Sequence, residues 1–394
     1  MTNIKRDISS FDITLLVLTL VLAAFGLLMV GSATGLGSGN VSGAFINQLI
    51  FLITGIVIML AAAFFDYQTI CKFYLPIYGV NILFLIIVLF MPKTAGVARW
   101  IGVTIGDTRF GIQPSEFAKI FMIIFLAALI NKYKDKINHP LIAGMVVAAT
   151  ALPAILIFVQ PSYSASIVVP IIMLVMLYAS KISYKYIIIP AVILVPLLLF
   201  LFIELHSENP LILNDILEPW QIDRIWQFLY SEGADIDTWQ NDQALMALSS
   251  GLLTGRGLFN NQIYVPYIEN DFIFSIIGAE FGFLGSLAVL AVFFLIVLKC
   301  FIIAYRSQVF LGKLLAVGAG ATIALQTFLH VGVNTFILPN TGINLPFISQ
   351  GGSAMWVFMG MVGLVLNVGM TREYSMFDTL GTKPRRLHIP IKPK

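Results

Sequence analysis

Long apolar segments, broken by short polar ones, occupy most of the 394-residue chain. A helix that crosses the hydrocarbon core of a bilayer needs roughly 20 apolar residues. Ten segments meet that requirement: 13–31, 46–64, 73–91, 114–131, 140–158, 163–180, 184–203, 272–298, 309–336 and 348–370. Only short polar breaks separate the spans between 140 and 203, so a merged pair there would change the count. The pattern predicts an all-α integral membrane protein, a single domain over residues 1–394 with ten transmembrane helices.

One stretch interrupts this pattern between the seventh and eighth predicted spans. Residues 204–271 contain eleven carboxylates and two arginines, a net charge of −9, which leaves +12 for the rest of a chain that totals +3. The sequence therefore predicts one large acidic loop between helices 7 and 8, where polar chemistry could take place outside the lipid.

Composition supports the membrane assignment. Hydrophobic residues make up 59% of the chain, charged residues 11%, and the mean hydropathy is +0.93. A soluble domain cannot cover that much apolar surface. The first apolar run continues to Val30 without a small-residue cleavage site, which indicates a first span rather than a removed signal peptide. The two cysteines and four histidines show neither disulfide nor metal-ligand spacing.

Basic residues indicate which side of the membrane each loop occupies. With ten spans and both termini on one side, that side holds seventeen of the 23 lysines and arginines. Lys119 lies within a span, and the opposite side holds five: Lys93, Arg99, Arg109, Arg224 and Arg256. Because a basic excess marks the cytoplasmic side, we expect cytoplasmic termini and an extracytoplasmic acidic loop. The basic tail, residues 371–394, would then lie next to anionic membrane lipids.

Two ionisable residues lie at the start of the predicted fourth span. Pro114 can open a helix, and Glu116 falls in its first turn, where the positive end of the helix dipole favours an anion. Lys119, three residues on, shares a helix face with Glu116 and can pair with it. The spacing alone favours a helix end with a snorkelling lysine. The alternative is a functional cavity, since charges inside a membrane are costly unless paired or hydrated.

Acidic residues also mark the start of the predicted eighth span. Asp271 immediately precedes the apolar run, so a helix N-cap is the simplest interpretation. A carboxylate at the edge of the bilayer, below a polar loop, is also well placed to act as a general base. Glu280, nine residues further on, lies too deep for a cap and needs a partner or water.

Two further polar groups each have a simple interpretation and an alternative. Residues 249–257 contain glycines beside Arg256, which suit a simple turn or an anion site formed by backbone N–H groups and a guanidinium. Gln326, His330 and Asn334 recur every four residues on one face of the predicted ninth span. Interhelical hydrogen bonding explains them more simply than a proton path does.

Four segments of the chain have the character of family motifs. They read ARWI with QPSEFAK (98–119), WQNDQALMALSSGLLTGRG (239–257), NDFIFSIIGAEFGFLG (270–285) and LPNTGINLPFISQGGS (338–353). In this order they resemble the FtsW/RodA/SpoVE family, also called the SEDS proteins, and the likeness covers nearly the whole chain. The resemblance implies ten spans in the bacterial cell membrane and an extracytoplasmic peptidoglycan glycosyltransferase that polymerises lipid II. Elongation, division and sporulation members share these segments.

The resemblance also implies partners and site residues. The partners would be lipid II, the nascent glycan strand and a class B penicillin-binding protein, with no nucleic acid. Asp271 matches the family's essential aspartate, which makes it the expected catalytic residue, and Glu116 with Lys119 matches the family's buried pair. The full set of residues expected to bind substrate or support the site is Arg99, Trp100, Glu116, Lys119, Gln243, Arg256, Glu280 and Ser349.

Three positions depart from the family pattern. Ser162 follows a Gln-Pro pair where members commonly have an acid, Gln350 replaces a tyrosine, and Ala98 replaces a basic residue. None of these changes removes Asp271, so they bear on substrate fit more than on chemistry.

The resulting hypothesis is an inverting glycosyl transfer. Asp271 accepts the proton of the acceptor sugar's 4-hydroxyl as that oxygen attacks the anomeric carbon of the lipid-linked donor, which leaves as undecaprenyl pyrophosphate. Arg99, Lys119, Arg256 or a divalent cation, magnesium or manganese, would offset the phosphate charge. Two other functions also suit ten spans with embedded charges: a carrier that flips the lipid-linked precursor, and a non-catalytic scaffold for a penicillin-binding protein.

Overall fold

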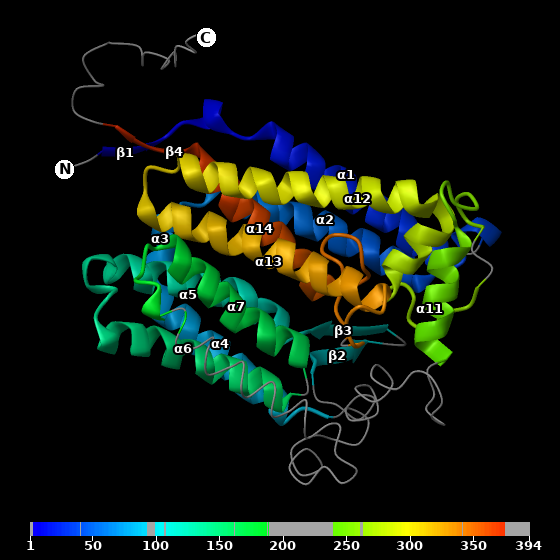
Figure 1. The fold of residues 1–394 in the computed structure, drawn as a ribbon, viewed down its shortest axis with the longest axis horizontal. Coiled ribbons are helices and arrows are strands. Elements are labelled where there is room, and N and C mark those ends of the chain that lie inside the picture. The colour runs from blue at the N-terminus through cyan, green and yellow to red at the C-terminus, as the bar shows by residue number, and fades with distance from the viewer. Residues whose placement is uncertain are drawn as a thin grey trace.

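The computed structural model describes residues 3–39, 41–92, 99–105, 108–160, 162–186, 188, 239–260, 263–340 and 342–374. Within these residues the chain is mostly helical, and the long helices run roughly along one axis (Figure 1). The helices are α1 (Ile13–Ala33), α2 (Gly43–Phe64), α3 (Tyr67–Lys72), α4 (Tyr74–Leu89), α5 (Pro114–Lys132), α6 (Pro140–Val159), α7 (Tyr163–Ala179), α11 (Trp239–Ser250), α12 (Ile273–Arg306), α13 (Phe310–Asn334) and α14 (Gly352–Met370).

Nine of the ten predicted spans coincide with one of these helices. In the part of the chain that the structure describes, seven helices are long and apolar enough to cross a membrane: α1, α2, α5, α6, α12, α13 and α14. Two shorter apolar helices, α4 and α7, occupy the predicted third and sixth spans. The predicted seventh span, 184–203, lies almost wholly outside the described residues, as do residues 204–238 of the acidic loop and 375–394 of the tail.

The apolar pattern places α5, α13 and α14 at the centre of the bundle. These three helices are buried over most of their length, whereas only 22% of α2 and 33% of α6 is buried. Large apolar side chains such as Ile53 and Phe294 point outward from the peripheral helices, as expected for a surface covered by lipid. The bundle therefore has a closed interior in which polar side chains need protein partners.

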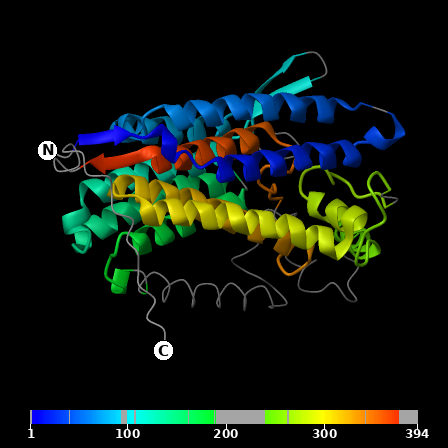
Figure 2. The same ribbon diagram turned by 90° about the horizontal axis from the view of Figure 1, so that it is seen from above.

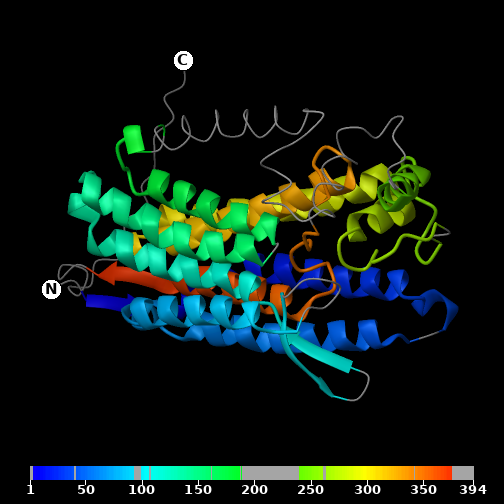
Figure 3. The same cartoon turned by 90° about the horizontal axis from the view of Figure 1, so that it is seen from below.

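Four short strands correct the expectation of an all-helical chain. β1 (Asn3–Arg6) pairs antiparallel with β4 (Thr371–Tyr374), so the two ends of the described chain lie together at the end of the bundle opposite α11 (Figure 1). β2 (Ile101–Ile105) and β3 (Thr108–Ile112) form an antiparallel hairpin that projects from the side of the bundle (Figure 2 and Figure 3). The hairpin segment lies between the third and fourth predicted spans and is rich in β-branched residues, which favour strands.

The longest helix, α12, is broken near its start. Gly282 has φ +67° and ψ −165°, outside the helical region. Four backbone hydrogen bonds of 2.8–3.0 Å join the break to the turn that follows α11. They run from Phe283 N to Leu252 O, from Leu284 N to Leu253 O, from Arg256 N to Ala279 O and from Gly257 N to Glu280 O.

The turn therefore pairs the backbone groups that the break leaves without helical partners. This explains the glycines of residues 249–257 better than a free turn or an anion site does, because the N–H groups of Arg256 and Gly257 already donate to carbonyls of α12. Gly255 approaches α12 so closely that a Cβ built on it would lie 2.1 Å from the carbonyl oxygen of Glu280.

We expect Gly255→Ala to destabilise the protein more than Gly257→Ala. Both glycines have positive φ, +82° and +94°, but a Cβ on Gly257 would meet nothing within 4 Å. Gly257→Ala bears only left-handed strain of about 1–2 kcal/mol, whereas Gly255→Ala must also displace the α12 backbone. Thermal unfolding of the purified variants in one detergent measures the difference. Equal melting temperatures would contradict the docking of this turn into the break.

Candidate functional site

A cavity of about 450 Å³ lies where several helices begin. Its lining comes from the N-terminal parts of α2, α5, α7 and α14, from the two residues 270–271 before α12, and from the C-terminal half of α13. Residues 99–100, 111 and 342–344 complete it. Neutral polar side chains from distant parts of the chain contribute much of the lining: Asn47, Gln113, Ser162, Ser164, Asn270, Gln326, Asn344 and Gln350. The bundle thus brings one end of five helices together around a polar interior space.

Some of these helix ends point uncapped backbone N–H groups toward the cavity. The first turn of a helix presents backbone N–H groups and the positive end of the peptide dipoles. At the cavity, Ser42 caps the first turn of α2, and Asn334 Oδ1 accepts from Ser275 N in the first turn of α12. The N-cap residues of α5, α7 and α14 make no side-chain cap. The arrangement favours an anionic ligand.

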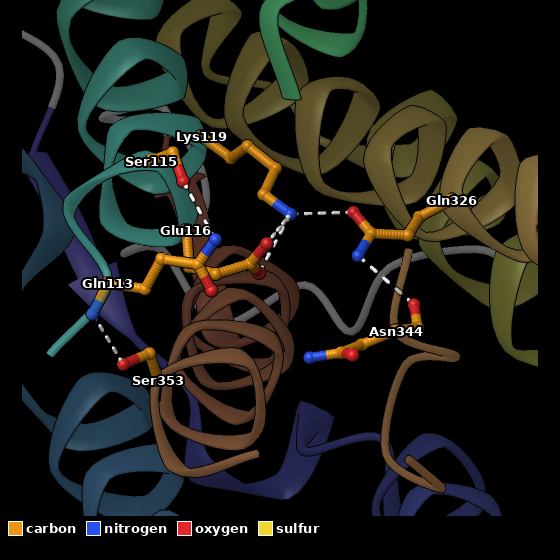
Figure 4. A network of polar contacts seen from close by, with 7 residues as sticks. All are labelled: Gln113, Ser115, Glu116, Lys119, Gln326, Asn344 and Ser353. Carbon is orange, nitrogen blue, oxygen red and sulfur yellow. Dashed lines mark hydrogen bonds and ion pairs between the residues drawn. The ribbon is translucent and has the colours of Figure 1, made fainter. Parts of the chain in front are cut away.

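A buried ion pair borders the cavity on α5 (Figure 4). Lys119 Nζ lies 2.8 Å from both carboxylate oxygens of Glu116 and 2.6 Å from Oε1 of Gln326 on α13. The two charged residues are 1% and 7% exposed. Three acceptors match the three N–H bonds of the ammonium, so the lysine charge is already compensated within the protein. The snorkelling interpretation of Lys119 is therefore wrong, because its ammonium lies inside the bundle.

The polar face of α13 holds the irregular segment that connects α13 to α14, which is orange in Figure 1. Gln326 Nε2 donates to the carbonyl oxygen of Asn344 at 3.2 Å (Figure 4). His330 Nδ1 donates to that of Ile343 at 2.6 Å. Asn334 Nδ2 donates to that of Asp271 at 2.8 Å. The predicted interhelical hydrogen bonding is confirmed, and these bonds bring both walls of the cavity to one helix.

Asp271 lines the cavity at the start of α12 and is half-buried. Three successive backbone carbonyls, those of residues 269, 270 and 271, each accept a hydrogen bond from outside the segment. The donors are Gln350 N at 2.9 Å, Ser349 Oγ at 2.6 Å and Asn334 Nδ2 at 2.8 Å. The backbone that carries the carboxylate is therefore held at three consecutive points.

Gly342 forms the wall opposite the carboxylate. Its φ of +65° is left-handed, and a Cβ built on it would lie 3.3 Å from Oδ2 of Asp271. Glycine suits this position for two reasons: it adopts a positive φ without steric strain, and its missing side chain leaves room for the carboxylate.

The other predicted site residues fall into two groups. Arg99 and Trp100 line the cavity together with Glu116, Lys119 and Asp271, and Arg99 Nε donates to the carbonyl oxygen of Gln160 at 3.4 Å. The structure places four others outside the lining: Gln243, Arg256, Glu280 and Ser349.

Three residues of the second group make hydrogen bonds elsewhere in the fold. Ser349 holds the carbonyl of Asn270 and is 3% exposed. Glu280 is buried beside the α12 break, where Ser32 Oγ donates to its carboxylate. Arg256 is exposed, with Nε donating to the carbonyl oxygen of Ser250 at 3.1 Å. Gln243 is half-buried on α11.

Several residues of the site were missed in the sequence. Gln48 on α2 is fully buried, and its side-chain amide bonds both the carbonyl oxygen of Ser349 and the N–H of Gly351, each at 3.2 Å. The backbone N–H of Gln113, just before α5, donates to Ser353 Oγ of α14 at 2.9 Å (Figure 4). A lone glutamine inside an apolar run was the available signal for Gln48, since such residues need internal partners.

The cavity lacks the ligand set of a dedicated metal site among the described residues. Among the residues that the structure describes, no group of three or more His, Cys, Asp or Glu side chains could hold an ion. Of the two carboxylates that line the cavity, Glu116 is bound by Lys119. The remaining donor set is not a dedicated metal site, so the divalent cation stays a prediction.

The fold and the cavity define a multi-pass membrane protein with a polar interior site that favours anions. The sequence model of the FtsW/RodA/SpoVE family, described as "Cell cycle protein", matches residues 13–374. The chain therefore belongs to the FtsW/RodA/SpoVE family, and the resemblance seen in the four motifs is confirmed.

Relatives of known name are similar over nearly their whole length. The chain is 30% identical to a probable peptidoglycan glycosyltransferase FtsW of Trichlorobacter lovleyi, over 92% of this chain and 93% of that protein. It is 29% identical to the stage V sporulation protein E of Bacillus subtilis, over 93% and 99%.

Solved structures share the fold. A chain of a peptidoglycan synthase complex that coordinates polymerization and crosslinking superposes with a TM-score of 0.75 at 22% identity, over 91% of this chain and 97% of that one. The rod shape determining protein RodA of Thermus thermophilus gives a TM-score of 0.65 at 21% identity, over 91% and 96%.

We expect Lys119→Met to lower the stability of the protein strongly. The change leaves the Glu116 carboxylate buried without its counterion, and such a loss costs about 3–5 kcal/mol. Lys132→Met, at the exposed end of the same helix, is the matched control and should change the melting temperature little. Comparable melting temperatures for both variants would show that the buried pair is not a structural requirement.

Proposed function

We propose that this protein is a peptidoglycan glycosyltransferase of the bacterial cell membrane that polymerises lipid II. Family membership and the names of the full-length relatives support the reaction class. The observation that carries the proposal is the position of Asp271, a carboxylate on a tightly held backbone at the wall of a polar cavity.

Asp271 acts as the general base in the proposed mechanism. It takes the proton of the acceptor sugar's 4-hydroxyl while that oxygen forms a bond to the anomeric carbon of the lipid-linked donor. The bond from that carbon to the pyrophosphate breaks at the same time, and its electron pair leaves with the undecaprenyl pyrophosphate. One displacement converts an α-linked donor into a β-linked product, and no covalent intermediate is needed.

The leaving pyrophosphate requires positive charge in the cavity. The three N–H bonds of the Lys119 ammonium all donate to Glu116 and Gln326. Arg256 is exposed and lies outside the cavity lining. Arg99 and the uncapped first turns of α5, α7 and α14 therefore supply the anion-stabilising groups of this proposal. No step is routed through a metal.

The proposed membrane arrangement has ten spans, with cytoplasmic termini and an extracytoplasmic acidic loop between helices 7 and 8. The β1–β4 pairing supports it, because an even number of spans returns both ends of the chain to one side. α11, which belongs to the acidic loop, lies at the opposite end of the bundle (Figure 1). The excess of basic residues then assigns the termini to the cytoplasm.

A class B penicillin-binding protein is the proposed protein partner. The solved chain of similar fold comes from a synthase complex that joins polymerization with crosslinking. A polymerase coupled to a crosslinking partner would pass the nascent glycan strand directly from one active site to the other.

We expect Asp271→Asn to abolish polymerisation. Loss of a general base costs about 10²–10⁴-fold in rate, and the amide keeps the shape of the side chain. Incubation of purified protein and partner with labelled lipid II, followed by gel separation of the glycan, measures the product. Glu269→Gln, two residues earlier and outside the lining, is the matched control and should remain active.

The same assay separates the three candidate functions. Polymer made by the wild-type protein supports the enzyme. Translocation of lipid II without polymer would indicate the carrier. If neither polymer nor translocation is observed, the scaffold remains. Full activity of Asp271→Asn would remove the proposed base.

Cysteine accessibility tests the membrane arrangement. Cys71 and Cys300 are both buried, and burial together with the charge of Asp66 raises the pKa of the Cys71 thiol to about 12. Such a thiol is unreactive toward maleimides, so the native chain is a clean background. In intact cells we expect a membrane-impermeant maleimide to label Leu253→Cys but not Tyr305→Cys, both of which are exposed positions at opposite ends of the fold. The reverse pattern would invert the topology.

A further inference from the structure

The side-chain amide of Asn334 sits between two backbone groups at the start of α12. Its Nδ2 donates to the carbonyl oxygen of Asp271 at 2.8 Å. Its Oδ1 accepts from the backbone N–H of Ser275 at 3.2 Å and from Ser275 Oγ at 3.1 Å. Asn334 itself is 1% exposed, at the end of α13.

These two backbone groups would otherwise bond to each other. In an α-helix the N–H of residue 275 donates to the carbonyl of residue 271, four positions earlier. Here Ser275 N donates instead to Phe272 O at 2.9 Å, and the amide of Asn334 is interposed between the freed carbonyl and the N–H. The inserted amide acts like an additional peptide group, and it keeps Asp271 out of the helix.

The orientation of the amide is determined by its surroundings. The carbonyl of Ile343 can only accept, so His330 Nδ1 carries the proton and His330 Nε2 is left as an acceptor. Nε2 and the carbonyl oxygen of His330 lie 3.3 Å and 3.0 Å from Asn334 Nδ2. An inverted amide would place Oδ1 against three acceptors, so the donor side must face Asp271.

We propose that Asn334 is a positioning residue for Asp271, a role that rests on the proposed function of that carboxylate. Without the interposed amide, the Asp271 carbonyl is free to pair with Ser275 N and join the helix. Each residue added to an α-helix turns by about 100° around its axis, so the carboxylate would swing away from the cavity wall. Asn334 touches no substrate in this proposal and acts only through the backbone.

Asn334→Asp tests the proposal because the ionised acid has no N–H donor, and the buried carboxylate that it introduces is matched in the control variant below. The acid keeps the shape and the acceptor for Ser275, but replaces Nδ2 with an oxygen that faces the Asp271 carbonyl. Displacement of a reacting group by about 1 Å costs on the order of 100-fold in rate. We expect kcat for lipid II polymerisation to fall about 10- to 100-fold, with KM changed less than about twofold.

Asn367→Asp is the matched control. Asn367 lies on α14, is fully buried and also donates its side-chain N–H groups to backbone carbonyls, those of Ala62 and Phe65. Both variants are compared as monodisperse protein with measured melting temperatures. Destabilisation alone would lower the yield of both, whereas a positioning role lowers kcat only in Asn334→Asp. If Asn334→Asp does not fold, Asn334→Ser, which is neutral and too short to reach Asp271, should show the same loss of kcat.

The possible outcomes are distinct. A wild-type kcat in Asn334→Asp or Asn334→Ser, beside an inactive Asp271→Asn, would overturn this inference alone. An equal loss of kcat in Asn367→Asp, or a rise in KM with kcat unchanged, would also overturn it. An active Asp271→Asn would instead remove the proposed function on which the inference rests.

Discussion

The structure depends on one constraint: backbone polar groups inside a membrane bundle must find partners within the protein. Three irregular segments meet it by pairing with elements distant in sequence. The turn at 252–257 fills the break of α12, the 269–271 segment is held by residues 334, 349 and 350, and the segment before α14 is held by α13. Irregular backbone inside a membrane protein is tolerated where it lines a cavity or is covered by protein. The 269–271 segment and the segment before α14 both contribute residues to the cavity lining.

Electrostatics follow from the same arrangement. The buried ammonium of Lys119 is stabilised because the Glu116 carboxylate neutralises its charge. Gln326 links this pair to Asn344 in the opposite wall of the cavity. Helix first turns then leave a diffuse positive potential for an anion, and Asp271 is the carboxylate set against it. In the proposed function, the phosphate ester is held by the helix dipoles and Arg99 rather than by the buried lysine, which leaves Asp271 as the base.

Much of the fold could be predicted because apolar length alone indicates a span, and nine predicted spans coincide with helices. The Glu116–Lys119 pair followed from helical spacing, which is local information. The hairpin at 101–112 was missed because β propensity is weak evidence beside strong hydropathy. Gln48 and Asn334 bond to partners 303 and 63 residues away in the sequence, Gly351 and Asp271. A local sequence pattern cannot predict contacts between residues so far apart. Glu280 shows the converse, since its depth suggested a site but its carboxylate is bound by Ser32 of α1, outside the cavity lining.

Binding of lipid II to the Asp271→Asn protein tests the central claim most directly. A base that acts only in the transition state contributes to turnover and not to ground-state affinity. The account predicts that the variant binds lipid II within about threefold of the wild-type Kd in native mass spectrometry of detergent-solubilised protein, while it forms no polymer. Loss of binding in step with loss of activity would contradict it, because Asp271 would then hold the substrate or the fold rather than take the proton.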